Sequence, residues 1–303
     1  MCYSAQLVAA FEEYQFYGGT LSIKDFDALY GHRFESKAKI PKMIDRWFAN
    51  PQTEDERRIR QSIDDFNTQS VRGWEQELFK QRKRLADAER KLAEKHTKAA
   101  AESQRIANNK VEQLLEWIDS AQRTTVESRD CRIFPNSYAP VLIWRDGQRQ
   151  IVPMRYMLRP AGKPPTIDKL ATLYNARRDN LEKFWKEQFG QTHGVVLASA
   201  FFEHVERDGQ NVILKFQPQT RQTMLAACLW SRWVGRDGDE LYSFAAITDE
   251  PPAEVAEAGH DRCIIPIKAE NLDAWLQPNG DTAAMQRILD DRERPYYEHR
   301  IAA

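Results

Sequence analysis

The chain has 303 residues, of which 42% are hydrophobic, and this is enough for one large domain or two ordinary ones with a substantial core. Its net charge of -1, from 44 basic and 45 acidic side chains, gives no overall attraction for nucleic acid, so any DNA site must be a local patch. No apolar run is long enough to cross a membrane and no signal-peptide pattern precedes the first motif, so we expect a soluble protein of the cytoplasm.

The four cysteines are too scattered along the chain to predict a disulfide framework or a structural zinc site. The histidines show no metal-ligand spacing, and the chain lacks both glycine-rich phosphate loops and the H-E-x-x-H zinc motif. We therefore expect reduced thiols and no cofactor or metal. The cysteines are Cys2, Cys131, Cys228 and Cys263.

The first candidate for chemistry along the chain is Cys2, which follows the initiator methionine. Once Met1 is removed, Cys2 presents a free α-amine and a thiol on one carbon skeleton. Such an aminothiol condenses with an aldehyde through the amine and then closes through sulfur to a thiazolidine. The pKa of an α-amine is about 8, so a useful fraction is neutral and nucleophilic at physiological pH. By itself a Met1-Cys2 sequence is common. It predicts aminothiol chemistry only if other residues of the chain also point to that reaction.

The segment between Pro51 and Pro135 contains no proline and is rich in Glu, Lys, Arg, Gln and Ala, which is the composition of long exposed helices. Two apolar stripes predict two helices packed back on each other, with the break near Asn108-Asn109. We assign residues 36–128 to a coiled-coil-like helical insertion. Its role is a surface insertion, a dimerisation arm or a clamp over DNA. The stripes are Val71, Trp74, Leu78, Leu85 and Leu92, then Ile106, Val111, Leu114, Leu115 and Ile118.

From Cys131 onward, short runs of β-branched and aromatic residues predict strands. The tripeptide Arg-Asp-Gly occurs three times between such runs, and Asp-Gly is typical of tight hairpin turns. We therefore expect an α+β fold with an antiparallel or mixed β-sheet or open barrel, and helices at Ile167–Gln188 and Asn271–Leu276. The expected hairpins pair Val141–Trp144 with Gln150–Met154, Val195–Phe202 with Val212–Phe216, and Met224–Trp230 with Leu241–Thr248.

Several short motifs in this part of the chain, taken in order with the N-terminus, resemble those of the SOS response-associated peptidase family. Members of that family process abasic sites in DNA. The resemblance covers about the first 20 residues and about residues 131–280. The motifs are Met1-Cys2, Ser137-Tyr138-Ala139-Pro140, Asn175-Ala176-Arg177, Phe202-Glu203 and His260-Asp261-Arg262, followed by a strand and Trp275-Leu276.

The resemblance implies a fold, a reaction and a domain division. Residues 1–35 and 129–303 would form the α+β catalytic domain. Cys2 would capture abasic sites in single-stranded DNA covalently, and the product would be a thiazolidine DNA–protein crosslink. The family also removes its own initiator methionine, which here would expose the Cys2 amine.

Four residues are candidates for the reaction beside Cys2. Glu203 follows two phenylalanines, where burial would raise the pKa of a carboxyl and suit it to act as a general acid. His260 could protonate the departing oxygen or assist reversal, since imidazole titrates near neutrality. Asn175 could orient the cysteine or the sugar, and Arg177 could grip a phosphate. Without the resemblance, a salt-bridged carboxylate, a structural histidine and a solvated arginine would be the preferred interpretations.

The chain departs from the family pattern at several positions. Tyr3 and Ser4 follow Cys2 where the family usually has glycine and arginine, so one phosphate contact is missing from the sequence. Ser137 replaces a usual asparagine, although Asn136 lies beside it, and a Trp-Gly pair near Tyr156 is absent. The base-stacking surface would then come from an aromatic residue such as Tyr156. The expected DNA-binding residues are Arg177, Arg262, Ser137, Asn136 and Tyr156.

Two alternatives to crosslinking stay open. In the first, the chain is an N-terminal-nucleophile amidohydrolase or cysteine peptidase acting in trans, with Cys2 as the thiolate and His260 as the base. In the second, it is a non-catalytic scaffold in which the helical arm binds a partner. The expected partners are single-stranded DNA with abasic sites and a second copy of the chain bound through the helical insertion.

Overall fold

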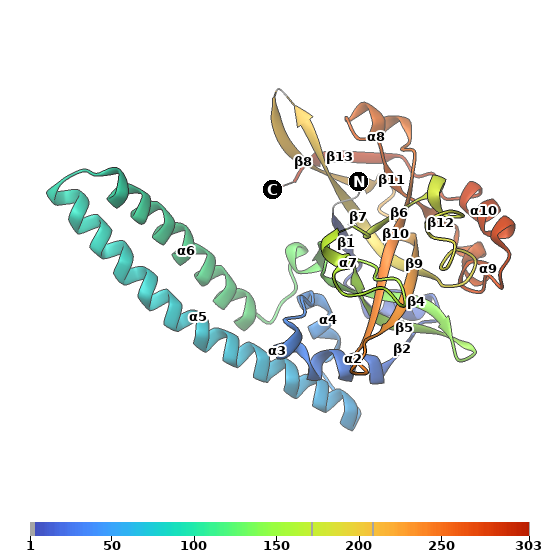
Figure 1. The fold of residues 1–303 in the computed structure, drawn as a ribbon, viewed down its shortest axis with the longest axis horizontal. Helices are drawn as coiled ribbons and strands as arrows, with labels where there is room; N and C mark the ends of the chain where they lie inside the picture. The colour runs from blue at the N-terminus through green and yellow to red at the C-terminus, as the bar shows by residue number, and fades with distance from the viewer. Residues whose placement is uncertain (1–3, 171, 208, 303) are drawn as a thin grey trace. The chain divides into compact units, whose positions relative to one another are not determined.

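The computed structural model describes residues 4–170, 172–207 and 209–302, and its contacts divide the chain into two units. Unit 1 combines the residues up to Asn50 with those from Glu127 onward, and unit 2 is Pro51–Val126 (Figure 1). The expected start of the helical insertion at residue 36 therefore differs from the division in the structure. Residues 36–50 and 127–128 belong to unit 1, and helix α4 (Lys42–Trp47) buries Met43 and Ile44 there.

Unit 1 contains thirteen described strands and several short helices. The strands are β1 (Ser4–Leu7), β2 (Thr20–Leu21), β3 (Arg132–Ile133), β4 (Tyr138–Arg145), β5 (Gln148–Tyr156), β6 (Asn175–Arg177), β7 (His193–Arg207), β8 (Gln210–Pro218), β9 (Met224–Val234), β10 (Glu240–Asp249), β11 (Cys263–Ile264), β12 (Pro266–Ile267) and β13 (Tyr297–Ile301). Besides α4, the helices are α1 (Phe11–Phe16), α2 (Ile23–Gly31), α3 (Arg33–Ser36), α7 (Ile167–Leu170), α8 (Ala253–Glu257), α9 (Leu272–Leu276) and α10 (Thr282–Asp290). Three 3-10 turns are η1 (Ser128–Cys131), η2 (Arg178–Asn180) and η3 (Ala269–Asn271).

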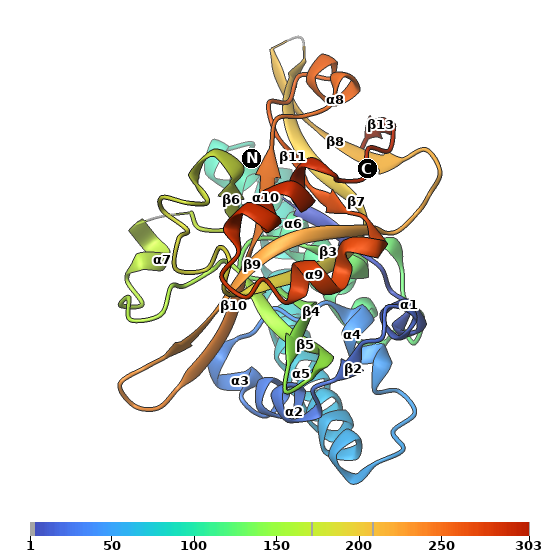
Figure 2. The same ribbon diagram turned by 90° about the vertical axis from the view of Figure 1, so that its right-hand side faces the viewer.

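Five strands close into a barrel. β4 pairs with β5, β5 with β10, β10 with β9, β9 with β7, and β7 with β4, and only the β5–β10 pairing in this ring is parallel (Figure 2). Closure removes the unpaired edges that an open sheet of these strands would expose. The expected α+β fold with a mixed sheet or barrel is confirmed, and the ring is closed. Residues with no exposed surface occur in all five strands, for example Val141, Val152, Leu197, Ala227 and Ala245.

The three predicted hairpins are present, although residues 195–198 of the second one pair with β9 instead of β8. β4 pairs with β5, β7 with β8, and β9 with β10, in each case antiparallel. The first turn has positive φ angles at both central residues, 54° at Asp146 and 78° at Gly147, as a tight hairpin turn of this kind requires. Glycine adopts such angles without steric cost, which explains why the Asp-Gly pattern predicted this hairpin.

The predicted long helix at Ile167–Gln188 is wrong. α7 ends at Leu170, and Asn175–Arg177 form β6, which runs parallel to β10 with Ala246 opposite Asn175. Pairing with the barrel buries Ala176 and satisfies the backbone of this segment, which outweighs its helical propensity. The second predicted helix, Asn271–Leu276, is confirmed by η3 and α9.

β7 is the strand that links the barrel to the surface where the site forms. Near its start it lies in the barrel, with Val195 opposite Leu142 of β4. Further along it leaves the ring and pairs with β1 on one side and β8 on the other, and β13 continues the sheet beyond β8. Ser4 at the start of β1 thereby lies opposite Phe202 of β7.

Unit 2 is a helical hairpin of α5 (Glu54–Glu94) and α6 (Lys98–Gln122). Thr53 caps α5 in a capping box with Glu56, and the Thr97 side chain accepts a hydrogen bond from the Ala100 amide at the start of α6. The expected break near Asn108-Asn109 is wrong, because the cap at Thr97 ends the loop eleven residues earlier and the exposed asparagines continue the helix. The buried side chains Leu78, Ala88, Ala100, Ala107 and Leu114 include members of both helices. No helix in the described part of the chain is both long and apolar enough to span a membrane.

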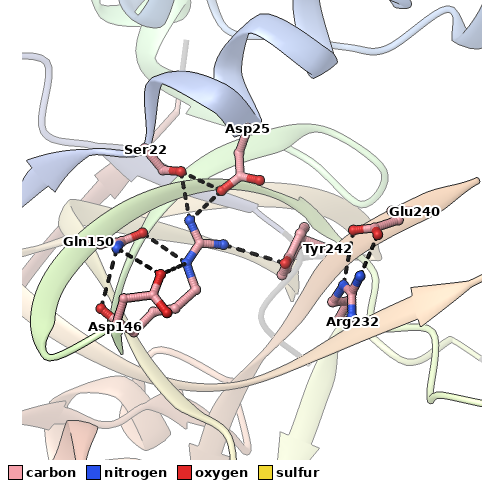
Figure 3. A network of polar contacts seen from close by, with 8 residues as sticks. Ser22, Asp25, Asp146, Gln150, Arg232, Glu240 and Tyr242 are labelled. Carbon is pink, nitrogen blue, oxygen red and sulfur yellow. Dashed lines mark hydrogen bonds and ion pairs between the residues drawn. The ribbon is translucent and has the colours of Figure 1, made fainter.

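Arg145 at the end of β4 joins three parts of unit 1. Its guanidinium donates to Ser22 Oγ at 2.6 Å and Asp25 Oδ2 at 2.5 Å, both at the start of α2. It also donates to Gln150 Oε1 on β5 at 2.8 Å and to the Tyr242 hydroxyl on β10 at 3.4 Å. Figure 3 shows these partners around the guanidinium, with the separate and exposed pair of Arg232 and Glu240 beside them. The network ties α2 to three barrel strands, namely β4, which carries Arg145, β5 and β10.

Replacing Arg145 by methionine should lower the free energy of unfolding by about 2–3 kcal/mol, because partly buried acceptors, the Asp25 carboxylate among them, lose their charged donor. Urea unfolding followed by circular dichroism measures this change. Arg232→Met is the matched control, since its pair with Glu240 is solvent-exposed and should contribute little. Equal losses in both variants would contradict the structural role of Arg145.

Candidate functional site

Glu203 and His260, which the sequence singled out separately, are in direct contact. Glu203 lies on β7, and His260 lies in the loop between α8 and β11. His260 Nε2 is 3.1 Å from Glu203 Oε2, and the exposed fractions of the two side chains are 8% and 0%. The structure therefore brings together two titratable groups in a site that is nearly closed to water.

The contacts of His260 Nδ1 bear on which tautomer of the imidazole faces Glu203. His260 Nδ1 is 2.9 Å from the Arg262 carbonyl and 3.3 Å from the Arg262 amide. If Nδ1 donates to the carbonyl, Nε2 and Oε2 are both acceptors unless one of them carries a proton. If Nδ1 instead accepts from the amide, Nε2 carries a hydrogen that it donates to Glu203. At 3.1 Å, His260 Nε2 and Glu203 Oε2 are close enough to exchange a proton in either tautomer.

Burial sets the charge of the imidazole in this pair. It lowers the pKa of His260 below its ordinary value, because a buried imidazolium is poorly solvated. The hydrogen bond to the Arg262 carbonyl opposes this effect and does not overcome it. The uncharged imidazole is accordingly favoured near neutral pH, where it can accept or relay a proton.

The first described residue of the chain pairs with the strand that carries Glu203. Ser4 is fully buried, and its hydroxyl accepts hydrogen bonds from Arg132 Nε at 3.1 Å and Nη2 at 3.0 Å. Ser4 lies opposite Phe202, the neighbour of Glu203 in β7. Cys2, the expected nucleophile, lies outside the described residues.

Asn175 and Tyr156 form a second polar contact within unit 1. The Tyr156 hydroxyl donates to Asn175 Oδ1 at 3.3 Å, and both residues are buried. The Tyr156 ring stacks on Phe244 with 5.0 Å between ring centroids and is only 2% exposed. Its burial does not fit the expected role of a base-stacking surface, and its contact in the structure instead orients the Asn175 amide.

Arg177 and Arg262 share a neighbour at the surface. Arg177 donates to Asp179 at 2.7 Å and is exposed. The hydrogen bond from Arg177, together with the positive charge of Arg262, holds the pKa of Asp179 below its usual range. Arg262 follows His260 by two residues, so this charged cluster adjoins the buried pair.

Ser137 and Asn136 form the turn that precedes β4. Asn136 has a φ angle of 72°, and its amide donates to the Tyr156 carbonyl at 2.8 Å. The buried Ser137 hydroxyl accepts from the Phe134 amide, and the Ser137 carbonyl accepts from the Tyr156 amide. Ser137 therefore holds the turn, whereas Asn136 is exposed to solvent.

The sequence did not single out Arg132. It lies 128 positions from Ser4, and only the antiparallel pairing of β1 with β3 brings the two together. No local motif could have signalled this contact, because neither residue stands out from its neighbours in the chain.

The described thiols do not offer another nucleophile. Cys131, Cys228 and Cys263 are free and buried, and burial raises the pKa of Cys131 to about 11. It also raises the pKa values of Cys228 and Cys263. Within residues 4–170, 172–207 and 209–302, no three His, Cys, Asp or Glu side chains are grouped to hold a metal ion.

Comparison with known proteins identifies one matching family. Residues 99–301 match the family model described as SOS response associated peptidase (SRAP). No curated protein matches the chain. Among solved structures, a protein from Bordetella bronchiseptica is 18% identical with a TM-score of 0.49, covering 60% of this chain and 90% of its own. A protein from Bacteroides thetaiotaomicron is 16% identical with a TM-score of 0.49, covering 57% and 78%. A phage-related protein from Bordetella bronchiseptica is 18% identical with a TM-score of 0.47, covering 60% and 85%.

The His260 imidazole should titrate with a midpoint below 6.5, the ordinary histidine pKa, because burial disfavours its charged form. NMR titration of ¹⁵N-labelled protein measures the midpoint, with His260→Gln to assign the signal. Glu203→Gln should lower the midpoint further, since an amide cannot stabilise the imidazolium as a carboxylate can. A midpoint at or above 6.5 would mean that attraction to Glu203 outweighs burial.

Proposed function

The chain belongs to the SOS response-associated peptidase family, and on this premise we propose that it captures abasic sites in single-stranded DNA covalently through Cys2. The family links the chain to DNA damage. The product would be a thiazolidine crosslink, formed in the cytoplasm after the chain removes its own initiator methionine. The observation that carries the proposal is the buried contact of Glu203 with His260 next to the first strand of the chain.

Covalent geometry supports a role for this pair in the chemistry of Cys2. Cys2 precedes Ser4 by two residues, and each residue spans at most about 3.6 Å, so the two Cα atoms are no more than about 7 Å apart. Ser4 itself is opposite Phe202, and Glu203 is the next residue of β7. This short covalent separation is what supports assigning Glu203 and His260 to the chemistry of Cys2.

The proposed reaction balances with water as the only leaving group. Glu203 gives its proton to the ring oxygen of the closed abasic sugar, and the C1 hydroxyl returns a proton to the pair as the aldehyde forms. The Cys2 amine adds to the aldehyde carbon, and the resulting hydroxyl leaves as water with a proton supplied by the Glu203 and His260 pair. The Cys2 sulfur then attacks the iminium carbon, and its proton returns to the pair. The new carbon–nitrogen and carbon–sulfur bonds close the five-membered ring.

The remaining site residues are proposed to position the DNA. Asn175, oriented by Tyr156, would hydrogen-bond the opened sugar or the cysteine. Arg177 and Arg262 would contact phosphate, and Arg177 would exchange its pairing with Asp179 for the DNA backbone. Asn136, exposed beside Ser137, would take the place of the asparagine that is usual in the family.

We assign unit 2 the role of an insertion that brings two copies of the chain together. Large apolar side chains on its helices face solvent, namely Phe79, Ile106, Leu115 and Trp117. Sedimentation equilibrium should therefore detect a dimer, and the double variant Phe79→Ser with Leu115→Ser should shift it toward monomer. A wild-type chain that stays monomeric at high micromolar concentration would contradict this assignment.

Incubation with a single-stranded oligonucleotide bearing one abasic site should produce a heat-stable shifted band on a denaturing gel. Cys2→Ala should abolish the band, and a preparation that retains Met1 should also lack it, because its amine is blocked. Glu203→Gln should slow capture by about 10²–10⁴-fold, as expected for loss of a general acid. Glu206→Gln changes an exposed carboxyl on the same strand and should have no effect.

Three outcomes would contradict the proposal. An undiminished band with Cys2→Ala would exclude the aminothiol. Hydrolysis of a peptide or amide without dependence on DNA would favour an amidohydrolase or peptidase acting in trans. Absence of any band from protein that begins at Cys2, as verified by mass spectrometry, would favour a non-catalytic scaffold.

A further inference from the structure

Across the outer sheet, a row of side chains begins at Ser4 and runs over three neighbouring strands. Ser4 of β1 is opposite Phe202 of β7, Phe202 is opposite Lys215 of β8, and Lys215 is opposite Arg300 of β13. Directly opposed residues in antiparallel strands project from the same face of a sheet. β7, β8 and β13 can be followed side by side in Figure 1 and Figure 2. Two cations therefore extend from the start of β1 on one face.

Arg132 of β3 adds a third cation to this row. Its guanidinium carbon is 3.7 Å from the centre of the Phe202 ring and 4.8 Å from that of Phe134. Two of its nitrogens also donate to Ser4 Oγ. Contacts with two aromatic rings and a hydroxyl hold the planar group in one orientation. Lys215 Nζ lies 6.0 Å from the same Phe202 ring, so both cations flank it.

The positive charges of Lys215 and Arg300 are poorly balanced. Partial burial, and then Arg300, Arg221 and Arg132, lower the pKa of Lys215. Of these neighbours, Arg221 has a carboxylate partner in Glu298 at 2.9 Å. Neither Lys215 nor Arg300 forms an ion pair with any residue that the structure describes. Cations held together without counter-charges attract an anion strongly.

We propose that Arg132, Lys215 and Arg300 form a phosphate-binding row that holds the backbone of the DNA strand beside the start of β1. This proposal rests on the proposed function and adds residues to which that function assigned no role. It also accounts for one departure of this sequence from the family pattern. The arginine that the family usually has at the position of Ser4 is absent, and Arg132 brings a guanidinium to that same serine from another strand.

Binding of an undamaged, fluorescein-labelled single-stranded oligonucleotide tests the row without the covalent step. Fluorescence anisotropy of the full chain over a range of salt concentrations gives the slope of log Kobs against log[salt]. Lys215→Gln with Arg300→Gln should reduce the magnitude of this slope by about 1.4, from about 0.7 per phosphate contact on a single strand. Arg287→Gln removes an exposed cation on α10 and is the matched control.

Arg132 is tested by two substitutions, because its loss could also loosen β1. Arg132→Lys keeps the charge and should retain most of the salt slope, whereas Arg132→Gln should reduce it by about 0.7. Thermal unfolding of both variants checks that the fold is intact. Equal slopes for Arg132→Gln and the wild type would remove Arg132 from the row.

The proposal and the proposed function fail in different ways. If the row variants weaken binding of intact DNA but the wild type forms no crosslink at an abasic site, the row stands and the covalent function is wrong. If crosslinks form but the Lys215 and Arg300 double variant binds intact DNA like Arg287→Gln, the row is wrong. Failure of the wild type to bind the intact oligonucleotide would also overturn it.

Discussion

The contact between the Glu203 carboxyl and the His260 imidazole, 3.1 Å apart and closed to water, is the constraint on which the rest of the site depends. A carboxyl without exposed surface is costly to ionise unless a partner shares its proton. The long strand β7 fixes the position of Glu203, because its first part lies in the closed barrel and its later part, which carries Glu203, pairs with β1. The barrel thus fixes the strand that brings Glu203 into contact with His260, next to the first described strand.

The sequence predicted those parts of the fold that local patterns determine. The hairpin of β4 and β5 follows from Asp146-Gly147, whose positive φ angles only a few residue types adopt readily. The segment around Asn175 was predicted as helix because its pairing with β10 is a long-range contact that local composition does not reveal. Similarly, the loop of the helical hairpin ends at the cap formed by Thr97. The sequence predicted this loop near Asn108-Asn109, because asparagine has a low helix propensity.

The candidate site also has some features that the sequence predicts and others that only the structure reveals. Glu203 and His260 could be selected as polar residues in apolar surroundings, yet their contact joins positions 57 residues apart and required the structure. Tyr156 looked available for stacking on a base but is buried against Phe244, because β5 turns that side chain inward. Arg132, Lys215 and Arg300 carry no local motif at all. Only the register of β1, β7, β8 and β13 aligns Lys215 and Arg300 with Ser4, and only the pairing of β1 with β3 brings Arg132 to the same serine.

The central claim is that the bond to DNA forms at the α-amine and thiol of Cys2. Peptide mass spectrometry tests it most directly, after reaction with an abasic oligonucleotide, nuclease trimming and trypsin digestion. The account predicts that the nucleotide remnant is on the N-terminal peptide Cys2–Lys24, that this peptide lacks Met1, and that its thiol no longer reacts with iodoacetamide. A remnant on a lysine elsewhere in the chain, or an N-terminal peptide that keeps Met1 in the crosslinked product, would contradict the account.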